Sequence, residues 1–214
     1  EYAAGLKMDL YRPDADGFDL IVWFHGGGLE SGCRADGAGL GAAFAAHGCG
    51  FASADYRMYP AARYPDYLLD GARAVAFALQ RAKEYGGSGR VIVSGQSAGA
   101  YMTMLLALNP ALLRNAGASC AAVAAYISDS AQQTTHFNVL RERGEDSRAE
   151  RIDPAAPLWY VGAERLPAPL LLIAYRDDIP CRPEQNALLY RSIRRFHPDA
   201  PIELVMLPGG LCAG

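Results

Sequence analysis

Short apolar runs separated by polar or helical stretches form the main pattern along the chain. Six such runs are bounded by Gly, Pro, Asp or Ser: FDLIVWFHG, CGFASADYR, GRVIVSGQ, CAAVAAYIS, APLLLIAYR and PIELVMLPG. Because their apolar residues are mostly continuous rather than alternating, they are typical of strands covered on both faces. The opening LKMDLYRPD instead alternates apolar and polar residues and meets Pro13, which predicts an edge strand.

Helical patterns lie between the expected strands, at about residues 36–48, 66–85, 98–108 and 182–196. The second of them carries an apolar stripe at helical spacing, made of Leu69, Ala72, Ala76 and Leu79. Strands that alternate with helices predict an α/β fold: one domain over residues 1–214, with a mostly parallel central sheet and helices on both faces. In such sheets, ligands bind beyond the carboxyl ends of the strands.

Residues 129–162 interrupt this alternation. They are polar, contain ERGEDSRAER and lie between two expected core strands. We therefore expect a short lid-like insertion over the sheet, helical in part. Few residues follow the last expected strand, so a closing helix at the carboxyl end is expected to be absent.

Composition argues against several classes of partner. The chain has 214 residues and a formal net charge of −3, with a sequence pI near 5.8, so we expect no nucleic-acid partner. It has no run of about 18 apolar residues, so we expect no membrane span. The five cysteines are scattered, which predicts no metal site and favours a reducing compartment such as the cytoplasm. The chain begins at Glu1 without a methionine, so a removed upstream signal stays open, as does the oligomeric state.

The pentapeptide GQSAG at 95–99 fits the pattern G-x-S-x-G between an expected strand and an expected helix. Small residues at both ends permit a strained turn that pushes the Ser97 hydroxyl into the open, with the helix N-terminus behind it. The structural alternative is an ordinary glycine-rich turn. The strand before the motif and the helix after it favour a nucleophile at Ser97.

A second glycine motif, HGGG at 25–28, directly follows the apolar run LIVWF. Backbone N–H groups can hold an oxyanion only where no side chain crowds the substrate oxygen, a condition that consecutive glycines meet. Together with the N–H of Ala98, Gly27 and Gly28 are therefore predicted to form an oxyanion hole. We expect His25 to orient this loop rather than to act as a base.

With these two motifs, the chain resembles the α/β-hydrolases of the carboxylesterase/lipase group that also contains hormone-sensitive-lipase-like enzymes. The stretch ADYRMYPAARYPDYLLDGARAVAF is similar to that group's segment after the fourth strand of its sheet. TTHFNVL, IDPAAPLWYVG and DDIPCRPEQNALLY are similar to one subgroup. The resemblance covers nearly the whole chain, and it implies an α/β-hydrolase fold and a serine carboxylesterase that needs no metal or cofactor.

The resemblance also implies a catalytic acid after the strand that follows the lid. Two carboxylates lie there, in LLLIAYRDDIPCRPEQN. Asp178 fits the subgroup's pattern because it stands two residues before the Pro-x-Arg run of Pro180 and Arg182, and Asp177 is the alternative. The other aspartate would then be a helix N-cap or first-turn residue.

The position of the catalytic base departs from the pattern that the resemblance implies. That pattern places a histidine after the last strand, in a form like Gly-x-His-Cys, but PGGLCAG holds Leu211 there. Leucine can neither take nor return a proton, so we expect turnover to be impaired.

None of the four histidines is an obvious replacement for this base. His25 belongs to the glycine loop, His47 ends a helix, and His197 precedes the last strand at the wrong end of the sheet. His136, in the lid-like segment, is the one that could approach Ser97 from above. A capping or loop-packing role is the favoured alternative for His136, and the subgroup's THFN motif supports it.

These residues predict serine-dependent hydrolysis of small carboxylic esters through an acyl-enzyme at Ser97. The short lid favours short acyl chains or acetylated substrates, by analogy of fold. Two alternatives stay open: a non-catalytic protein that binds a small molecule in the same pocket, and an amide or formamide hydrolase of the same fold.

A third motif, DGAGLGAAF at 36–44, matches G-x-G-x-x-A, and Asp55 lies where a ribose-binding acid would. A dinucleotide site requires these glycines to follow a strand immediately. The segment HGGGLESGCRAD separates them from LIVWF, so we favour a helix start with small residues.

Overall fold

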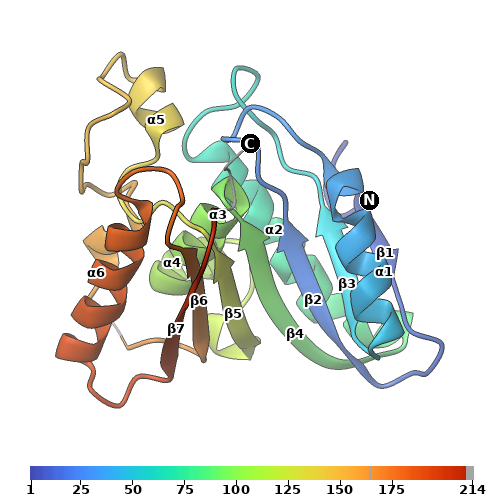
Figure 1. The fold of residues 1–214 in the computed structure, drawn as a ribbon. Helices are drawn as coiled ribbons and strands as arrows, with labels where there is room; N and C mark the ends of the chain where they lie inside the picture. Colours follow the sequence, from blue (N-terminus) through green and yellow to red (C-terminus); the bar gives the residue numbers. More distant parts are fainter. Residues whose placement is uncertain (164, 211–214) are drawn as a thin grey trace.

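The computed structural model describes residues 1–163 and 165–210 of the chain (Figure 1). Within these residues one seven-stranded sheet has the order β1-β3-β2-β4-β5-β6-β7. Its strands are β1 (Met8–Tyr11), β2 (Phe18–Phe24), β3 (Gly50–Ala54), β4 (Gly87–Gln96), β5 (Val123–Asp129), β6 (Leu170–Tyr175) and β7 (Ile202–Leu207). Only β1 is antiparallel to its neighbour. The mostly parallel sheet and an edge strand at the start of the chain were both predicted, and the fold class is confirmed.

Six α-helices lie in the described part of the chain: α1 (Ala38–Ala46), α2 (Asp66–Arg81), α3 (Ala98–Leu108), α4 (Pro110–Asn115), α5 (Phe137–Glu142) and α6 (Arg182–Phe196). Short 3-10 helices occupy Arg34–Gly37, Ala82–Tyr85, Cys120–Ala122 and Pro157–Tyr160. The helix predicted over 36–48 is therefore a 3-10 turn followed by α1. The pattern missed α4, which begins at Pro110 only two residues after α3 ends.

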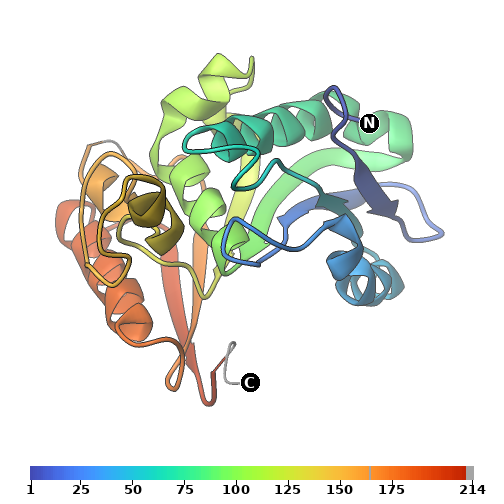
Figure 2. The ribbon, with the colours of Figure 1, turned by 90° about the horizontal axis from the view of Figure 1, so that it is seen from above.

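The helices cover both faces of the sheet (Figures 1 and 2). On one face, Ile21, Trp23 and Phe51 form a small cluster, and Phe44 of α1 stacks on Phe51 with ring centroids 5.5 Å apart. On the other face, Val22 and the alternate strand residues join the main core with α2, α3 and α6. Alternate residues of one strand point to opposite faces, so continuous apolar runs are what a doubly covered sheet requires.

Helix α2 buries a face slightly different from the predicted stripe. Leu68, Ala72 and Val75 are buried, whereas Leu69 and Leu79 are only half-buried. The buried face of α2 packs against α3. A Cβ added at Gly71 would lie 3.0 Å from Met102 Cε, so the glycine lets the two helices approach closely at that point.

A buried carboxylate paired with two half-exposed arginines joins α2 to the segment after β3. The Asp70 carboxylate is fully buried and accepts hydrogen bonds from Arg57 Nε at 2.7 Å and Arg57 Nη2 at 2.9 Å. Arg73 Nη1 donates a further bond to it at 3.0 Å. A buried carboxylate needs such partners, and here they hold the segment after β3 against the helix.

The part of residues 129–162 that carries α5 lies beyond the carboxyl ends of the strands (Figure 1), whereas the end of the segment returns along α6, where Gly162 approaches the ring of Phe196. Tyr64, which precedes α2, contacts this segment twice: its N–H donates to Glu142 Oε2 and its hydroxyl to Pro154 O, both at 3.0 Å. Tyr101 of α3 donates its hydroxyl to Ala155 O. The segment is therefore tied to the body of the fold, and its role as a lid stays a prediction.

Candidate active site

Ser97 occupies the turn between β4 and α3 with φ 52° and ψ −113°. A positive φ is uncommon for a residue with a side chain, and such strain persists only where the surroundings enforce it. The surroundings here are the neighbouring strand and the helix: Ser97 N–H donates to Asp129 O at 2.8 Å, and Ser97 O accepts from Tyr101 N at 2.9 Å. The hydroxyl of the half-buried Ser97 thus stands at the carboxyl edge of the sheet.

The two glycines of G-x-S-x-G are required by close packing. A Cβ at Gly99 would lie 2.0 Å from Phe24 O, and a Cβ at Gly95 would lie 2.3 Å from the Gly99 backbone. Real Cβ atoms do not approach other atoms so closely. Both glycines therefore allow the first turn of α3 to press against β2 and β4 while Ser97 turns outward.

The glycine loop lies beside Ser97 and its peptide groups are held in orientation. A Cβ at Gly26 would be 3.3 Å from Ser97 Cβ. The carbonyl of Gly26 accepts a bond from His25 Nδ1 at 2.7 Å. The carbonyl of Gly27 accepts bonds from Glu30 N, Ser31 N and Ser31 Oγ at 3.0–3.1 Å.

These bonds determine where the predicted oxyanion donors point. In a trans peptide the N–H is directed opposite to the preceding carbonyl. Fixing the carbonyls of Gly26 and Gly27 therefore fixes the N–H groups of Gly27 and Gly28. The N–H of Ala98, at the first position of α3, is the third donor and lies at the positive end of the helix.

His25 serves this loop. Its ring is buried and stacks on Tyr56 with centroids 4.3 Å apart, and the Tyr56 hydroxyl donates to His25 O at 2.8 Å. Burial lowers the pKa of His25, so the ring is neutral and its Nδ1 carries the proton donated to Gly26 O. The His25 ring therefore orients the glycine loop, and its Nδ1 is used in the hydrogen bond to Gly26 O.

Asp178 and Asp177 differ clearly in their surroundings. Asp178 is half-buried; its Oδ2 accepts a hydrogen bond from Ser130 Oγ, and its Oδ1 accepts one from Ile179 N at 2.8 Å. Asp177 is exposed, and its backbone N–H donates to Gly209 O at 2.9 Å. Of the two, Asp178 is the one whose carboxylate contacts the residue that follows β5, the strand that also contacts Ser97, and its role as the acid stays a prediction.

Two residues at the end of β5 connect these parts, and the sequence analysis did not single them out. The carbonyl of Asp129 accepts from Ser97 N, while the hydroxyl of Ser130 donates to Asp178. The Asp129 carboxyl accepts from Gln96 Nε2 at 3.4 Å and from the Tyr175 hydroxyl, and burial raises its pKa. Their only sequence signal is their place directly after a core strand.

Arg182 is the third residue whose role at the site the sequence did not reveal. The sequence shows it only as part of the Pro-x-Arg run. In the structure its side chain turns inward: the residue is 3% exposed, and Nη1 donates to Ser97 Oγ at 3.4 Å. A guanidinium stays protonated in proteins. Arg182 therefore places a permanent positive charge beside the candidate nucleophile and cannot be its base.

His136, the histidine that could approach Ser97 from above, is the N-cap residue of helix α5. Its Nδ1 accepts a bond from Asn138 N at 3.2 Å, which caps the helix, and its ring packs on Tyr101 with centroids 5.0 Å apart. Burial, helped by the charge of Arg182, lowers the pKa of His136 to about 3. Such a weakly basic ring suits the capping role.

The other two histidines and the base position lie elsewhere. His47 is exposed at the end of α1, and His197 follows α6 near the amino end of β7. Leu211 lies outside the described residues. Among the described residues, no group of three His, Cys, Asp or Glu side chains could hold a metal ion. In the same part of the chain, no helix has the length and apolarity that a membrane crossing requires.

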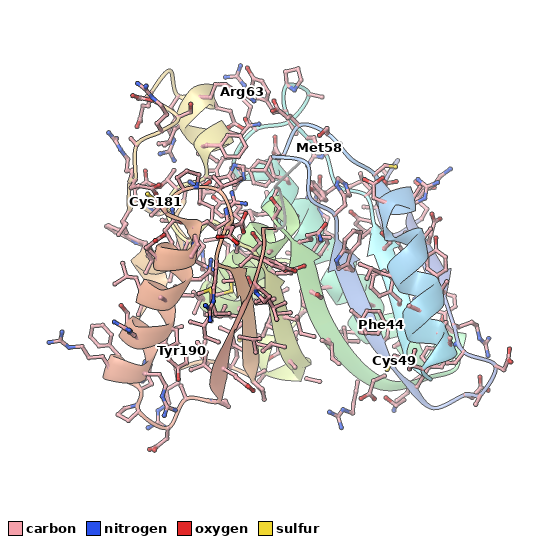
Figure 3. All side chains as sticks on the ribbon, viewed as in Figure 1. Phe44, Cys49, Met58, Arg63, Cys181 and Tyr190 are labelled. Carbon is pink, nitrogen blue, oxygen red and sulfur yellow. The ribbon has the colours of Figure 1, made fainter. Side chains whose placement is uncertain are left out.

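A cavity of about 420 Å³ lies between the 129–162 segment and the start of α6, and Arg182 of its wall contacts Ser97. Its wall includes Gln132, Phe137, Glu150, Cys181, Arg182 and Gln185. Figure 3 shows Cys181 at the top of α6, below the segment that carries α5. Phe137 connects this wall to the glycine loop, since a Cβ at Gly28 would meet its ring at 2.9 Å.

Comparison with known proteins agrees with the resemblance to α/β-hydrolases of the carboxylesterase group. Residues 8–141 match the BD-FAE family. A probable isoprenylcysteine alpha-carbonyl methylesterase of Arabidopsis thaliana, ICMEL2, is 31% identical over 116 residues, covering 53% of this chain and 28% of that protein. Its counterpart ICMEL1 of Oryza sativa subsp. japonica is 35% identical over 109 residues, covering 50% and 26%. The chain thus spans about a quarter of the length of these curated relatives.

Solved structures extend the likeness to the whole fold. The butyrate-bound Est2 esterase of Thermogutta terrifontis superposes with a TM-score of 0.77 at 24% identity, covering 95% of this chain and 78% of the other. The same enzyme phosphorylated by paraoxon gives a TM-score of 0.77 at 21% identity, covering 96% and 78%. The family match spans more than half of the chain and the structural likeness nearly all of it, so the chain belongs to the BD-FAE family and has the α/β-hydrolase fold.

Proposed function

We propose that this chain is built to hydrolyse small carboxylic esters through an acyl-enzyme at Ser97, and that Leu211 impairs its turnover. The observation that carries the proposal is the strained Ser97 turn beside a glycine loop in which the carbonyls of Gly26 and Gly27 are held by hydrogen bonds. It supports a hydroxyl and a set of N–H donors that act on the same ester carbonyl. Acyl transfer needs that combination.

In the proposed reaction, Ser97 Oγ attacks the ester carbonyl carbon and the carbonyl oxygen becomes an oxyanion. The N–H groups of Gly27, Gly28 and Ala98 hold this charge. The C–O bond to the alcohol then breaks, leaving an acyl group on Ser97 that water removes in a second, equivalent step. Asp178 would orient the base and stabilise its charged form.

The base is the missing part of this mechanism. A histidine would take the Ser97 proton and return it to the leaving alcohol, and Leu211 can do neither. Loss of a triad base in a serine protease costs about 10⁶ in turnover and leaves about 10³–10⁴ over water, because the oxyanion hole and binding remain. We expect the chain to retain the pocket and a trace of hydrolysis.

The relatives support the substrate class without identifying the substrate. One structural neighbour is an esterase with butyrate bound, and the curated relatives are methylesterases. The modest volume of the neighbouring cavity, about 420 Å³, favours short acyl or acetylated esters over long alkyl chains.

The test compares the chain with its Leu211→His variant on p-nitrophenyl acetate, each beside a Ser97→Ala control. We expect Leu211→His to gain several orders of magnitude in kcat/KM, and Ser97→Ala to abolish the gain. Rapid turnover by the unaltered chain that depends on Ser97 would instead show another base at work, and His136→Asn would then be measured.

A second readout does not depend on deacylation. A structural neighbour of this chain is phosphorylated by paraoxon, so we expect paraoxon to leave one diethylphosphoryl group on Ser97, faster in Leu211→His. Absence of capture in both chains, with small esters still bound, would favour a non-catalytic binding protein.

A further inference from the structure

We propose that Phe137 sets the length limit of the substrate, because its ring closes the space beside Gly28, a predicted oxyanion donor. This inference rests on the proposed function and deepens it, since it assigns the selection of short esters to one side chain. The starting observation is an exposure that the neighbouring residues do not share. Residues 131–140 are all buried except Phe137, which is half-buried and lines the cavity.

The start of α5 fixes the backbone from which the ring emerges. His136 caps the helix through Nδ1, and the N–H of Phe137 donates to Gln132 Oε1 at 3.3 Å. Asn138, the next residue, is fully buried and donates from Nδ2 to Gly28 O at 2.9 Å. The residues on both sides of Phe137 are therefore held in place, and one of them is bonded to the glycine loop itself.

The ring of Phe137 is also held by its contacts. It packs on the ring of His136 with centroids 4.3 Å apart, and that ring packs on Tyr101 with centroids 5.0 Å apart. The tip of the Phe137 ring meets the glycine loop, because a Cβ added at Gly28 would lie 2.9 Å from Phe137 Cζ. Real Cβ atoms do not come so close, so not even a methyl group fits between the loop and the ring.

A role in the apolar core does not account for this position. In the described part of the chain, Phe137 belongs to neither core cluster, nor to the half-buried side chains packed against them. Its ring instead joins Ile179 and Pro180 as an apolar part of the cavity wall. A chain of methylene groups needs such a surface, and the start of α5 and the loop before α6 supply it together.

Polar side chains of the same wall have hydrogen-bond partners within the protein. Gln132 donates from Nε2 to Thr135 O at 3.1 Å, and Gln185 donates from Nε2 to Glu150 Oε2 at 2.8 Å. These groups do not favour a methylene chain over water. The length of chain that the cavity accepts therefore depends on its apolar side chains, among which Phe137 contacts the glycine loop.

The cavity meets the candidate site at two places. Arg182 of its wall contacts Ser97 Oγ at 3.4 Å, and Phe137 contacts Gly28. An ester whose carbonyl oxygen lies at the glycine loop thus has one half, acyl or alcohol, directed along this wall. A short chain stays on the near side of the Phe137 ring, whereas a longer chain meets the ring where it closes against Gly28.

The test measures kcat/KM of the Leu211→His chain with and without Phe137→Ala. The acyl series is p-nitrophenyl acetate, butyrate and hexanoate, and the alcohol series is methyl, butyl and hexyl acetate. We expect Phe137→Ala to raise the ratio of the six-carbon to the four-carbon ester about tenfold in one series, because each further buried methylene group is worth about fourfold. That series identifies the half of the substrate that Phe137 limits. Phe196→Ala, the same change at a ring that is 59% exposed at the end of α6, should leave both ratios within about twofold.

A ratio of two esters in one variant is insensitive to partial unfolding, so a destabilised Phe137→Ala chain remains informative. Phe137→Trp gives a second measurement in the opposite direction, since the larger ring should lower the same ratio several-fold. Unchanged ratios in Phe137→Ala, or a shift in the same direction in both variants, would overturn the inference.

Binding separates this inference from the proposed function. If the Leu211→His chain hydrolyses none of these esters, the proposed function fails. NMR titrations of the Ser97→Ala chain with methyl butyrate and methyl hexanoate, and with butyl acetate and hexyl acetate, then test Phe137 alone. An affinity ratio of the longer to the shorter ester that rises about tenfold with Phe137→Ala in one pair supports the length limit. Ratios that are the same with and without the ring overturn it.

Discussion

The two sides of the candidate site are built by different means. On the nucleophile side, formed by β2, β4 and α3, backbone packs on backbone: Gly99 fits against Phe24 O, and Gly95 against Gly99. On the acid side, formed by β5, the lid-like segment and α6, side-chain amides and hydroxyls hold the parts together. Gln133, for example, donates from Nε2 to Asn186 Oδ1 at 2.8 Å.

This difference determines what each side tolerates. A backbone contact admits only glycine, so its sequence is nearly forced, and the match to the BD-FAE family at residues 8–141 includes all of the nucleophile side. A side-chain network can be satisfied by several combinations of polar residues. We therefore expect the acid side, to which Arg182 belongs, to tolerate more substitutions than the nucleophile side.

The largest effect is expected from Gly99→Ala. Its Cβ would lie 2.0 Å from Phe24 O, a backbone atom that cannot move aside without shifting β2. We expect a loss of more than about 4 kcal/mol of unfolding free energy, the range of severe core disruption, measured by urea denaturation. Gly39→Ala, in α1 with open space around it, is the matched control and should be neutral or stabilising by up to about 1 kcal/mol. A small loss of unfolding free energy in Gly99→Ala would show that the nucleophile side can accommodate a side chain at this position.

The second-largest loss of unfolding free energy is expected on the acid side, from Asn186→Leu. Asn186 donates from Nδ2 to Ala131 O and Arg182 O at 2.9 Å and accepts from Gln133. Leucine has a similar size but leaves the buried partners of Asn186 without hydrogen bonds, and each unpaired group costs about 1–3 kcal/mol. Because the surrounding structure relaxes and recovers part of this cost, we expect the unfolding free energy to fall by about 3 kcal/mol in total. Leu188→Ala, at an exposed position of the same helix, should cost under about 0.5 kcal/mol. A loss below 1 kcal/mol would mean that the amide network contributes little to this side.

The same division explains what could be predicted from the sequence. The Ser97 turn, the glycine loop and the strand pattern depend on local chemistry or on periodicity, and both can be read along the chain. Asp178 came from a short motif, and its contact with Ser130 now distinguishes it from Asp177. Helix α4 was missed because it follows α3 with only Asn109 between them, which periodicity does not separate.

The contacts that were not foreseen join residues far apart in sequence. Arg182 meets Ser97 across 85 positions, and Ser130 meets Asp178 across 48. Polar residues in such places look like ordinary surface residues until the fold buries them. Their roles follow from burial and distance, which the sequence pattern does not contain.

A smaller effect concerns pH and the lid-like segment. The pKa of His136 is lowered to about 3 from an ordinary value of 6.5, so the folded state holds the neutral ring. The unfolded chain takes up the proton, and stability from this residue is complete above pH 6.5 and lost as pH falls towards 3. Between pH 7.5 and 5 the loss from His136 is about 2 kcal/mol.

The variant His136→Asn keeps a good N-cap for α5 but has no group to titrate. Between pH 7.5 and 5 its unfolding free energy should fall by about 2 kcal/mol less than that of the unaltered chain. Urea denaturation at a series of pH values measures this difference. His47→Asn, which removes an exposed histidine of α1, is the control. An unchanged slope in His136→Asn would show that the ring is hydrated in solution.

The smallest effect is expected from the ion pair between Glu30 and Arg141, which joins the glycine loop to α5. Both side chains are 40–45% exposed, so solvent screens the pair and a double-mutant cycle with Glu30→Gln and Arg141→Gln should give about 0.2–1 kcal/mol, less in high salt. The buried bond beside it, from Asn138 Nδ2 to Gly28 O at 2.9 Å, should matter more. Asn138→Ala should therefore cost about 1–3 kcal/mol and lower kcat of the Leu211→His chain. If the exposed ion pair proved stronger than this buried bond, surface charge rather than buried polar contact would join the two sides of the site.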